Sequence, residues 1–281
     1  MTPTSAEKAR MIRSVELSLT DMGPGLSVGV NGIDGETARR DTPAAGARPQ
    51  PVPRDAPRGV PSESLPPWRS VLAVVAHPDD ESFGLGAVID SFIRAGADVS
   101  VLCLTHGEAS TLHGVAGELK LIREAELRAA GVALGISAVQ LEAYPDGGLA
   151  AVPLTTLAAE VSRTAASVAA DGIIAFDSSG VTGHTDHIAA TAAAVQVGAD
   201  EGLEVLGWTL PAEVATTLRA EFGAPFLGHS CDEIDFTIVV QRSSQMAAVA
   251  CHPSQALPAS VLWRRLDLLG EREHLRWLHT V

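Results

Sequence analysis

Strand-like and helix-like segments alternate along this chain from Trp68 to about residue 199. Four short apolar runs have the length and branching of strands that are buried on both faces: Val71–Ala76, Val99–Thr105, Val139–Tyr144 and Gly172–Phe176. Each run is followed by a segment of helical length, at 81–95, about 117–134, 154–170 and 185–199. Strands that alternate with such helices pair in parallel through right-handed crossovers. The sequence therefore predicts an α/β fold, with a mostly parallel sheet flanked by helices.

The two ends of the chain differ from this middle part. Ten of the 17 prolines lie in residues 1–68, which cannot bury enough apolar surface to offset the entropy of ordering. We therefore predict a flexible, Pro-rich N-terminal extension over 1–68, with a short helix near Ala6–Leu17, and one folded domain over 69–281. Near the C-terminus, the patterns at Glu204–Leu210 and Asp235–Val240 are typical of strands, with antiparallel pairing at an edge left open. That at Val261–Leu278 is typical of a terminal helix.

The composition restricts the partners and the location of the protein. The formal net charge is -14, which argues against nucleic acid as the main partner because phosphate binding needs a basic surface. No apolar run reaches the ~18 residues of a membrane span, and the N-terminus lacks the apolar core of a secretory signal. The three cysteines have no paired spacing, which favours a reducing compartment. We expect a cytoplasmic protein, and leave open whether it forms homo-oligomers.

The first apolar run ends in a cluster of polar side chains, His77-Pro78-Asp79-Asp80-Glu81. Ligands bind at the carboxyl ends of strands in open α/β sheets, and packing alone does not place three acids there. The histidine and one aspartate can hold a divalent cation, and the other aspartate can act as a base on a water molecule. The alternative is a solvated acidic cap for the next helix, which explains the acids but not His-Pro.

A second polar motif, Gly183-His184-Thr185-Asp186-His187, follows the fourth strand. Two histidines three residues apart at the start of a helix can project toward one metal or substrate site. Asp186 between them can form the hydrogen bond that fixes the tautomer of an imidazole. The alternative is a capped helix that carries two exposed histidines.

Together the two motifs resemble those of the LmbE/PIG-L superfamily of zinc-dependent N-deacetylases, over roughly residues 70–255. The resemblance implies a Rossmann-like sheet and a metal site formed by His77, Asp80 and His187. The implied metal is Zn²⁺, and another divalent cation such as Fe²⁺ is compatible with the same ligands. Asp79 is the implied general base. His184 is implied to assist the tetrahedral intermediate or the leaving amine.

The resemblance also extends to weaker marks. Arg123 and Asp146 correspond to residues that hold sugar hydroxyls, and we include Asp186 among the catalytic residues. His252, in Cys251-His252-Pro253-Ser254-Gln255, resembles an element that shapes the substrate pocket, although a helix-terminating turn explains it equally well. Mycothiol-pathway members carry a tyrosine where this chain has Thr182, so the resemblance does not imply a tyrosine-assisted oxyanion here.

The predicted function is hydrolysis of an N-acetyl group from an amino-sugar-containing small molecule or conjugate. The alternatives are an amidase that acts on a larger thiol or glycopeptide conjugate, and a non-catalytic metal-binding protein of the same fold. The histidines His106 and His113 near the end of the second strand are explained as solvated loop residues.

Overall fold

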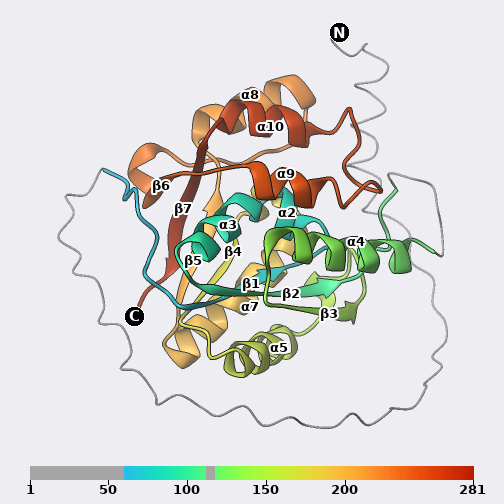
Figure 1. The fold of residues 1–281 in the computed structure, drawn as a ribbon, viewed down its shortest axis with the longest axis vertical. Coiled ribbons are helices and arrows are strands. Elements are labelled where there is room, and N and C mark those ends of the chain that lie inside the picture. The colour runs from blue at the N-terminus through green and yellow to red at the C-terminus, as the bar shows by residue number, and fades with distance from the viewer. Residues whose placement is uncertain (1–59, 112–117) are drawn as a thin grey trace.

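A seven-stranded sheet forms the centre of the protein, in the order β3-β2-β1-β4-β5-β7-β6 (Figure 1). The computed structural model describes residues 60–111 and 118–281. The strands are β1 (Ser70–Val75), β2 (Asp98–Thr105), β3 (Ala138–Tyr144), β4 (Gly172–Phe176), β5 (Glu204–Thr209), β6 (Phe236–Val239) and β7 (Arg272–His279). Neighbours from β3 to β5 pair in parallel, and β7 runs antiparallel to both β5 and β6. The predicted α/β fold with a mostly parallel sheet is confirmed.

Both faces of the central strand β1 are covered, as its continuous apolar run predicts. Val71, Ala73 and Val75 belong to one core cluster, and Leu72 and Val74 belong to a second. Figure 1 shows α3, α4, α8, α9 and α10 on the first side of the sheet and α5 and α7 on the other. The helices are α2 (Asp80–Phe83), α3 (Gly86–Arg94), α4 (Leu119–Leu134), α5 (Leu154–Ser167), α6 (Gly180–Gly183), α7 (Thr185–Glu201), α8 (Ala212–Phe222), α9 (Ser243–Val249) and α10 (Val261–Leu269), with 3-10 turns at η2 (Leu149–Ala151) and η3 (Cys231–Glu233).

The helix predicted at 81–95 is interrupted in the structure. The chain forms the single turn α2, passes through Gly84 and Leu85, and begins α3 at Gly86. A Cβ atom at Gly84 would lie 2.4 Å from the ring of Phe176 at the end of β4. Glycine therefore allows the carboxyl ends of β1 and β4 to approach each other, which brings together the two polar motifs.

The prediction of a terminal helix over Val261–Leu278 is wrong in its second half. The helix α10 ends at Leu269, Gly270 adopts φ 55° and ψ -128°, and the chain enters β7. β7 lies between β5 and β6, so its backbone hydrogen bonds are satisfied on both sides. Tertiary pairing thus overrides the helical propensity of Arg272-Glu273-His274-Leu275. The helices α8 and α9 were not predicted.

The first described residues pack against the sheet. Ser62 bridges to Phe236 of β6, and Trp68 is buried, with its ring stacked on Phe92 at a centroid distance of 5.6 Å. The predicted helix near Ala6–Leu17 and the loop residue His113 lie outside the described residues, and the extension stays a prediction. Among the described helices, none is long and apolar enough to cross a membrane. The cytoplasmic location likewise stays a prediction.

Candidate active site

The two polar motifs meet at the carboxyl edge of the sheet, between β1 and β4. These strands are parallel neighbours, so the residues after Val75 and after Phe176 emerge side by side. From β1 the chain proceeds to β2 and β3 on one side and then returns to β4 on the other. This reversal of strand order creates a crevice that commonly binds ligands in open α/β sheets.

Three predicted metal ligands converge in this crevice. His77 Nδ1 lies 3.2 Å from His187 Nε2 and 3.5 Å from Asp80 Oδ2, and His187 Nε2 lies 3.2 Å from Asp80 Oδ1. His77 and Asp80 are buried and His187 is half-buried. The structure therefore places His77, Asp80 and His187 so that each can contribute one atom to a common ion.

The outer nitrogens of both imidazoles have oxygen partners. His77 Nε2 lies 3.1 Å from Asp146 Oδ1 and 3.4 Å from Asp186 Oδ2, and His187 Nδ1 lies 3.3 Å from the carbonyl oxygen of Gly180. If these outer nitrogens carry the protons of neutral rings, the two facing nitrogens present lone pairs to each other and to the Asp80 carboxylate. In that state a cation between them would satisfy both lone pairs and the carboxylate, and two imidazoles with one carboxylate are the ligands of many catalytic zinc and iron(II) sites. The residues present therefore fit a divalent metal.

The ionisation of the cluster follows from its charges. Burial by itself lowers the pKa of His77, but Asp146, Asp186 and Asp80 raise it well above its usual value. Burial by itself raises the pKa of Asp80, but His187 and His77 lower it well below its usual value. Asp80 Oδ2 also accepts the backbone N–H groups of Ala76 and His77, at 3.2 and 2.9 Å. Asp80 is thus held as a carboxylate.

Asp79, the predicted base, has a different environment from Asp80. Its Oδ2 lies 3.0 Å from Arg123 NH2, and its side chain remains 16% exposed. Burial raises the pKa of Asp79 to about 6, against the lowering effect of Arg123 and with a further upward contribution from Asp80. A carboxyl group with this pKa can accept a proton near neutral pH and release it again. The predicted role of Asp79 as a base fits its surroundings.

His184 caps the helix α7 and lies against the cluster formed by the side chains of His77, Asp80 and His187. Its Nδ1 accepts the backbone N–H of Asp186 at 3.3 Å, and its ring stacks on that of His187 at a centroid distance of 4.6 Å. Burial lowers the pKa of His184 to about 4, with further lowering by His187 and His77. His184 is therefore neutral near pH 7, and its remaining proton is on Nε2, from which it can donate a hydrogen bond.

Asp186 is the most deeply buried of the predicted catalytic residues. Its carboxylate accepts the backbone N–H groups of Gly147 and Leu149, at 2.7 and 3.0 Å, and approaches His77 Nε2. Asp186 therefore connects the loop after β3 to His77 and orients the imidazole ring. In this position it supports a neighbouring residue and does not contact a substrate.

The predicted substrate-binding residues make protein contacts. Arg123 is 3% exposed and donates to the carbonyl oxygens of Gly107 and Pro78, both at 2.7 Å. Asp146 accepts from the Ala109 N–H and pairs with His77. His252 is 0% exposed. The predicted substrate-binding roles of Arg123, Asp146 and His252 stay predictions.

Glu81 is a site residue to which the sequence assigned no function. It is fully buried; its Oε1 lies 2.7 Å from His252 Nε2 and 2.6 Å from Ser82 Oγ, and its Oε2 accepts the Asp79 N–H at 2.9 Å. Burial by itself lowers the pKa of His252, but the Glu81 carboxylate raises it above its usual value. The only sequence signal was the glutamate that ends the first motif.

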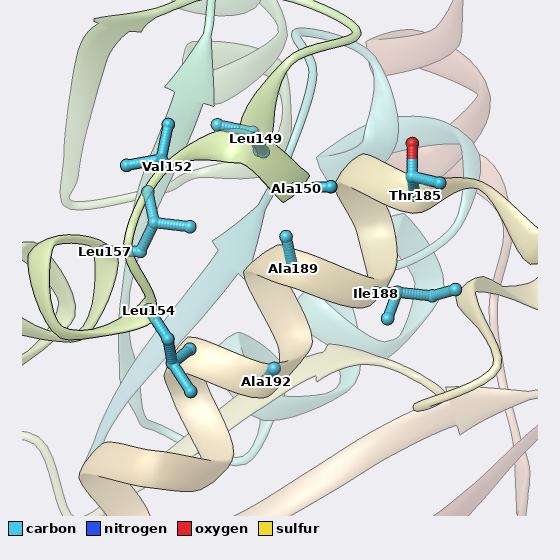
Figure 2. Close-up of a pocket in the computed structure, with 9 residues that line it drawn as sticks. All are labelled: Leu149, Ala150, Val152, Leu154, Leu157, Thr185, Ile188, Ala189 and Ala192. Atoms are coloured by element: carbon cyan, nitrogen blue, oxygen red, sulfur yellow. The ribbon is translucent and has the colours of Figure 1, made fainter. Parts of the chain in front are cut away.

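A separate apolar pocket of about 340 Å³ lies between α7 and the start of α5 (Figure 2). Its lining includes Leu154 and Leu157 of α5 and Ile188 and Ala192 of α7. Nothing in its lining can ionise, so it offers apolar contact but no acid–base chemistry.

Comparison with known proteins identifies the family. The family model described as PIG-L, GlcNAc-PI de-N-acetylase, matches residues 72–197, which contain both polar motifs. The chain is 30% identical over 228 residues to the 1D-myo-inositol 2-acetamido-2-deoxy-alpha-D-glucopyranoside deacetylase of Saccharomonospora viridis, covering 66% of this chain and 84% of that protein. The chain belongs to the PIG-L family. The family predicted from the two motifs is thus confirmed.

Another relative, the enzyme of the same name from Kineococcus radiotolerans, is 30% identical over 187 residues. That match covers 54% of this chain, which spans about half (52%) of that protein. These PIG-L relatives are named as deacetylases, which are hydrolases of amide bonds, the class that the motifs predict.

Solved structures share the fold at lower identity. The N,N'-diacetylchitobiose deacetylase of Pyrococcus horikoshii has a TM-score of 0.56 at 19% identity and covers 75% of this chain and 84% of its own. The zinc-inhibited form of a teicoplanin deacetylase has a TM-score of 0.56 at 19% identity, and the match covers 74% of this chain and 97% of that chain. The 4-carboxy-2-hydroxymuconate hydratase of Pseudomonas putida has a TM-score of 0.55 at 18% identity, and the match covers 76% of this chain and 97% of that chain. The fold therefore hosts more than one reaction.

Proposed function

We propose that this PIG-L protein is a metal-dependent N-deacetylase that removes an acetyl group from the nitrogen of an amino-sugar conjugate. The observation that carries the proposal is the convergence of two imidazole nitrogens and the Asp80 carboxylate beside the separate carboxylate of Asp79. Support for the substrate class comes from the relatives, which are named for 2-acetamido-2-deoxy-glucopyranoside substrates.

His77 Nδ1, the Asp80 carboxylate and His187 Nε2 would hold the metal, with Zn²⁺ or Fe²⁺ compatible with these donors. When bound, the metal polarises the acetamide carbonyl and lowers the pKa of a water molecule from 15.7 to about 7. Asp146 and Asp186 keep the proton of His77 on Nε2, so that Nδ1 remains available as a ligand.

Asp79 moves the protons of the reaction. Its carboxylate accepts a proton from the water that attacks the carbonyl carbon, and returns it to the nitrogen as the C–N bond breaks, which yields acetate and a free amine. His184 donates its Nε2–H to the oxygen on which negative charge develops, as a neutral imidazole. The ring is neutral because burial lowers the pKa of His184 to about 4.

Two reactions are tested in the same experiment. They are removal of an acetyl group from small amino sugars and removal of an acyl group from larger conjugates, which the teicoplanin deacetylase suggests. The purified chain, loaded with Zn²⁺ or Fe²⁺, is incubated with N-acetylglucosaminyl inositol, N,N'-diacetylchitobiose and an N-acylated glycopeptide. Mass spectrometry then detects the loss of an acyl group, with matched release of acetate for the first two. No loss of an acyl group from any of the three substrates, with metal bound, would contradict the proposal.

A further inference from the structure

The backbone of the proposed base is held in a conformation that L-residues rarely adopt. Asp79 has φ 149° and ψ -23°, outside the regions open to residues with a Cβ atom. Such a conformation persists only where surrounding contacts determine it. The contacts that hold the backbone of Asp79 therefore help to set the orientation of its carboxylate.

Asp79 is held at three places. Its backbone N–H donates to Glu81 Oε2 at 2.9 Å, and its carbonyl oxygen accepts from the N–H groups of Ser82 and Phe83 at 3.0 and 2.7 Å. Its side chain pairs with Arg123. The carbonyl contacts are those of any helical turn, whereas the contact at the N–H depends on one side chain, Glu81.

Glu81 is itself fixed by a segment distant in the sequence. Its other oxygen lies 2.7 Å from His252 Nε2, a residue 171 positions later in the chain. Neither side chain is exposed to any extent, so water cannot replace either partner. The pair connects the loop after α9 to the backbone of Asp79.

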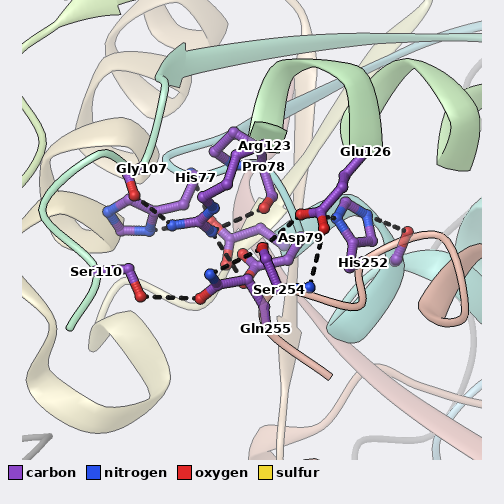
Figure 3. Close-up of polar contacts among 12 residues, drawn as sticks. His77, Pro78, Asp79, Gly107, Ser110, Arg123, Glu126, His252, Ser254 and Gln255 are labelled. Atoms are coloured by element: carbon purple, nitrogen blue, oxygen red, sulfur yellow. Dashed lines mark hydrogen bonds and ion pairs between the residues drawn. The ribbon is translucent and has the colours of Figure 1, made fainter. Parts of the chain in front are cut away.

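The helix α4 contacts both Asp79 and the loop that carries His252. Arg123 contacts the Asp79 carboxylate, and Glu126, one turn later, accepts from the backbone N–H of Ser254 at 2.9 Å and from its hydroxyl at 2.5 Å. Figure 3 shows Arg123 and Glu126 directed from α4 toward Asp79 and His252, respectively. The loop that carries His252 is thus tied to the helix that carries Arg123.

The geometry points to Glu81 and His252 as positioning residues that hold Asp79, through its backbone N–H, in the orientation needed for proton transfer. This inference rests on the proposed function in taking Asp79 as the base. It assigns to the segment around His252 a role within the protein interior, in place of the substrate contact predicted from the sequence.

The kinetic test replaces Glu81 by a side chain of similar volume without an acceptor. In the metal-loaded Glu81→Met variant, kcat should fall by a factor on the order of 10 to 10², the effect of misplacing a reacting group by about 1 Å. KM and metal content should not change. In an Asp79→Asn background the same substitution should cause no further fall, because the group that Glu81 positions is already lost. An equal fall in kcat on Glu81→Met substitution, with Asp79 present and in the Asp79→Asn background, would overturn the inference.

Two comparisons separate positioning from loss of fold. Glu81→Gln keeps an oxygen for the Asp79 N–H and should recover most of the lost kcat; a folded Gln variant as slow as the Met variant would contradict the inference. Asp171→Ala is the matched control, because Asp171 Oδ2 accepts the backbone N–H groups of Arg69 and Ser70, at 2.7 and 3.1 Å, at the opposite end of β1. It should lower the melting temperature and leave kcat unchanged, and a kcat loss like that of Glu81→Met would count against a specific role.

A second test does not depend on catalysis. Asp79→Gly and Asp79→Ala both lack the carboxylate and differ only at Cβ, so their difference in urea midpoint reports the strain at this position. With Glu81 present the Gly variant should be the more stable, and with Glu81→Met this advantage should disappear. An advantage that persists would show that Glu81 does not impose the conformation. If the stability differences among these four variants are as expected while no amide is hydrolysed, the proposed function fails and the positioning of Asp79 stands.

Discussion

Asp79 and Asp80 are neighbours in the chain, yet their carboxylates occupy different environments. Asp80 lies between His77 and His187, and Asp79 lies against Arg123. The turn at Asp79, with φ 149°, separates the directions of the two side chains. One carboxylate can thus bind a metal while the other moves a proton.

At the scale of residues, metal binding should depend on the three converging side chains. Alanine variants of His77, Asp80 and His187 should each lose bound metal, because a catalytic site with two ligands left binds weakly. Metal content after gel filtration measures this. His229→Ala, which removes a histidine paired with Asp177, serves as the control and should keep its metal. Full metal occupancy in all three variants would rule out the assignment.

The second residue-scale prediction separates chemistry from metal binding. Asp79→Asn is nearly isosteric but cannot accept a proton, so kcat should fall by a factor on the order of 10² to 10⁴ while metal content stays constant. His184→Ala should behave in the same way, because His184 is not one of the three converging ligands. His187→Ala should instead lose metal together with activity. Release of metal by Asp79→Asn would show that Asp79 is a ligand.

The dependence of activity on pH should respond to Arg123. A base must be deprotonated, so kcat/KM should fall as the pH drops through the pKa of Asp79, which is about 6 in this structure. Arg123 lowers this pKa, and Arg123→Met should therefore move the acidic limb of the profile to higher pH. Arg128→Met, on the exposed side of the same helix, is the control. An acidic limb that does not move would exclude Asp79 as the group that titrates.

At the scale of elements, the C-terminal segment shows how one glycine ends a helix and begins a strand. Gly270 has φ 55° and ψ -128°, and no atom lies within 4 Å of the position that a Cβ would take. The requirement is therefore one of backbone conformation and not of space. β7 depends on this turn to pass between β5 and β6.

Gly270→Ala should accordingly lower the free energy of unfolding by about 1–3 kcal/mol, the cost of a non-glycine residue in such a conformation. Urea denaturation measures this loss. The metal content should be unchanged, because the proposed metal ligands lie on the turn α2, the loop after β1 and the helix α7. A free energy of unfolding equal to that of the original chain would mean that the turn relaxes without strain.

At the scale of the whole molecule, the order of the strands places the site. β1 is the first strand of the described chain, and it lies in the interior of the sheet between β2 and β4. The segments that follow β1, β3 and β4 therefore converge at one edge, where His77 lies beside Asp146 from the loop after β3 and His187 from the helix α7.

The N-terminal boundary of the domain can be measured by truncation. A protein that begins at Val60 should keep its thermal stability and metal content, because it retains the bridge from Ser62 to Phe236 and the buried Trp68. A protein that begins at Arg69 should be less stable by about 3–5 kcal/mol, the usual loss when a buried tryptophan is removed. Equal melting temperatures for the two proteins would show that Trp68 contributes nothing to the core.

The sequence alone predicted the parallel part of the sheet and the meeting of the two polar motifs at one edge, and the family resemblance added the choice of His77, Asp80 and His187 as the implied metal ligands. Apolar runs bounded by polar motifs are local patterns, and parallel pairing brings the ends of β1 and β4 to one edge whatever the details of packing. This is why His77 and His187, 110 residues apart, could be assigned to one site.

Only the tertiary structure decided the rest. The place of β7 between β5 and β6, the burial of Arg123 and the pairing of Glu81 with His252 all depend on contacts between segments far apart in the chain. Local propensity favoured a terminal helix where β7 lies, and the motif around His252 gave no sign of its contact with Glu81. Buried backbone and charged groups must find partners within the fold, and the sequence does not show where those partners lie.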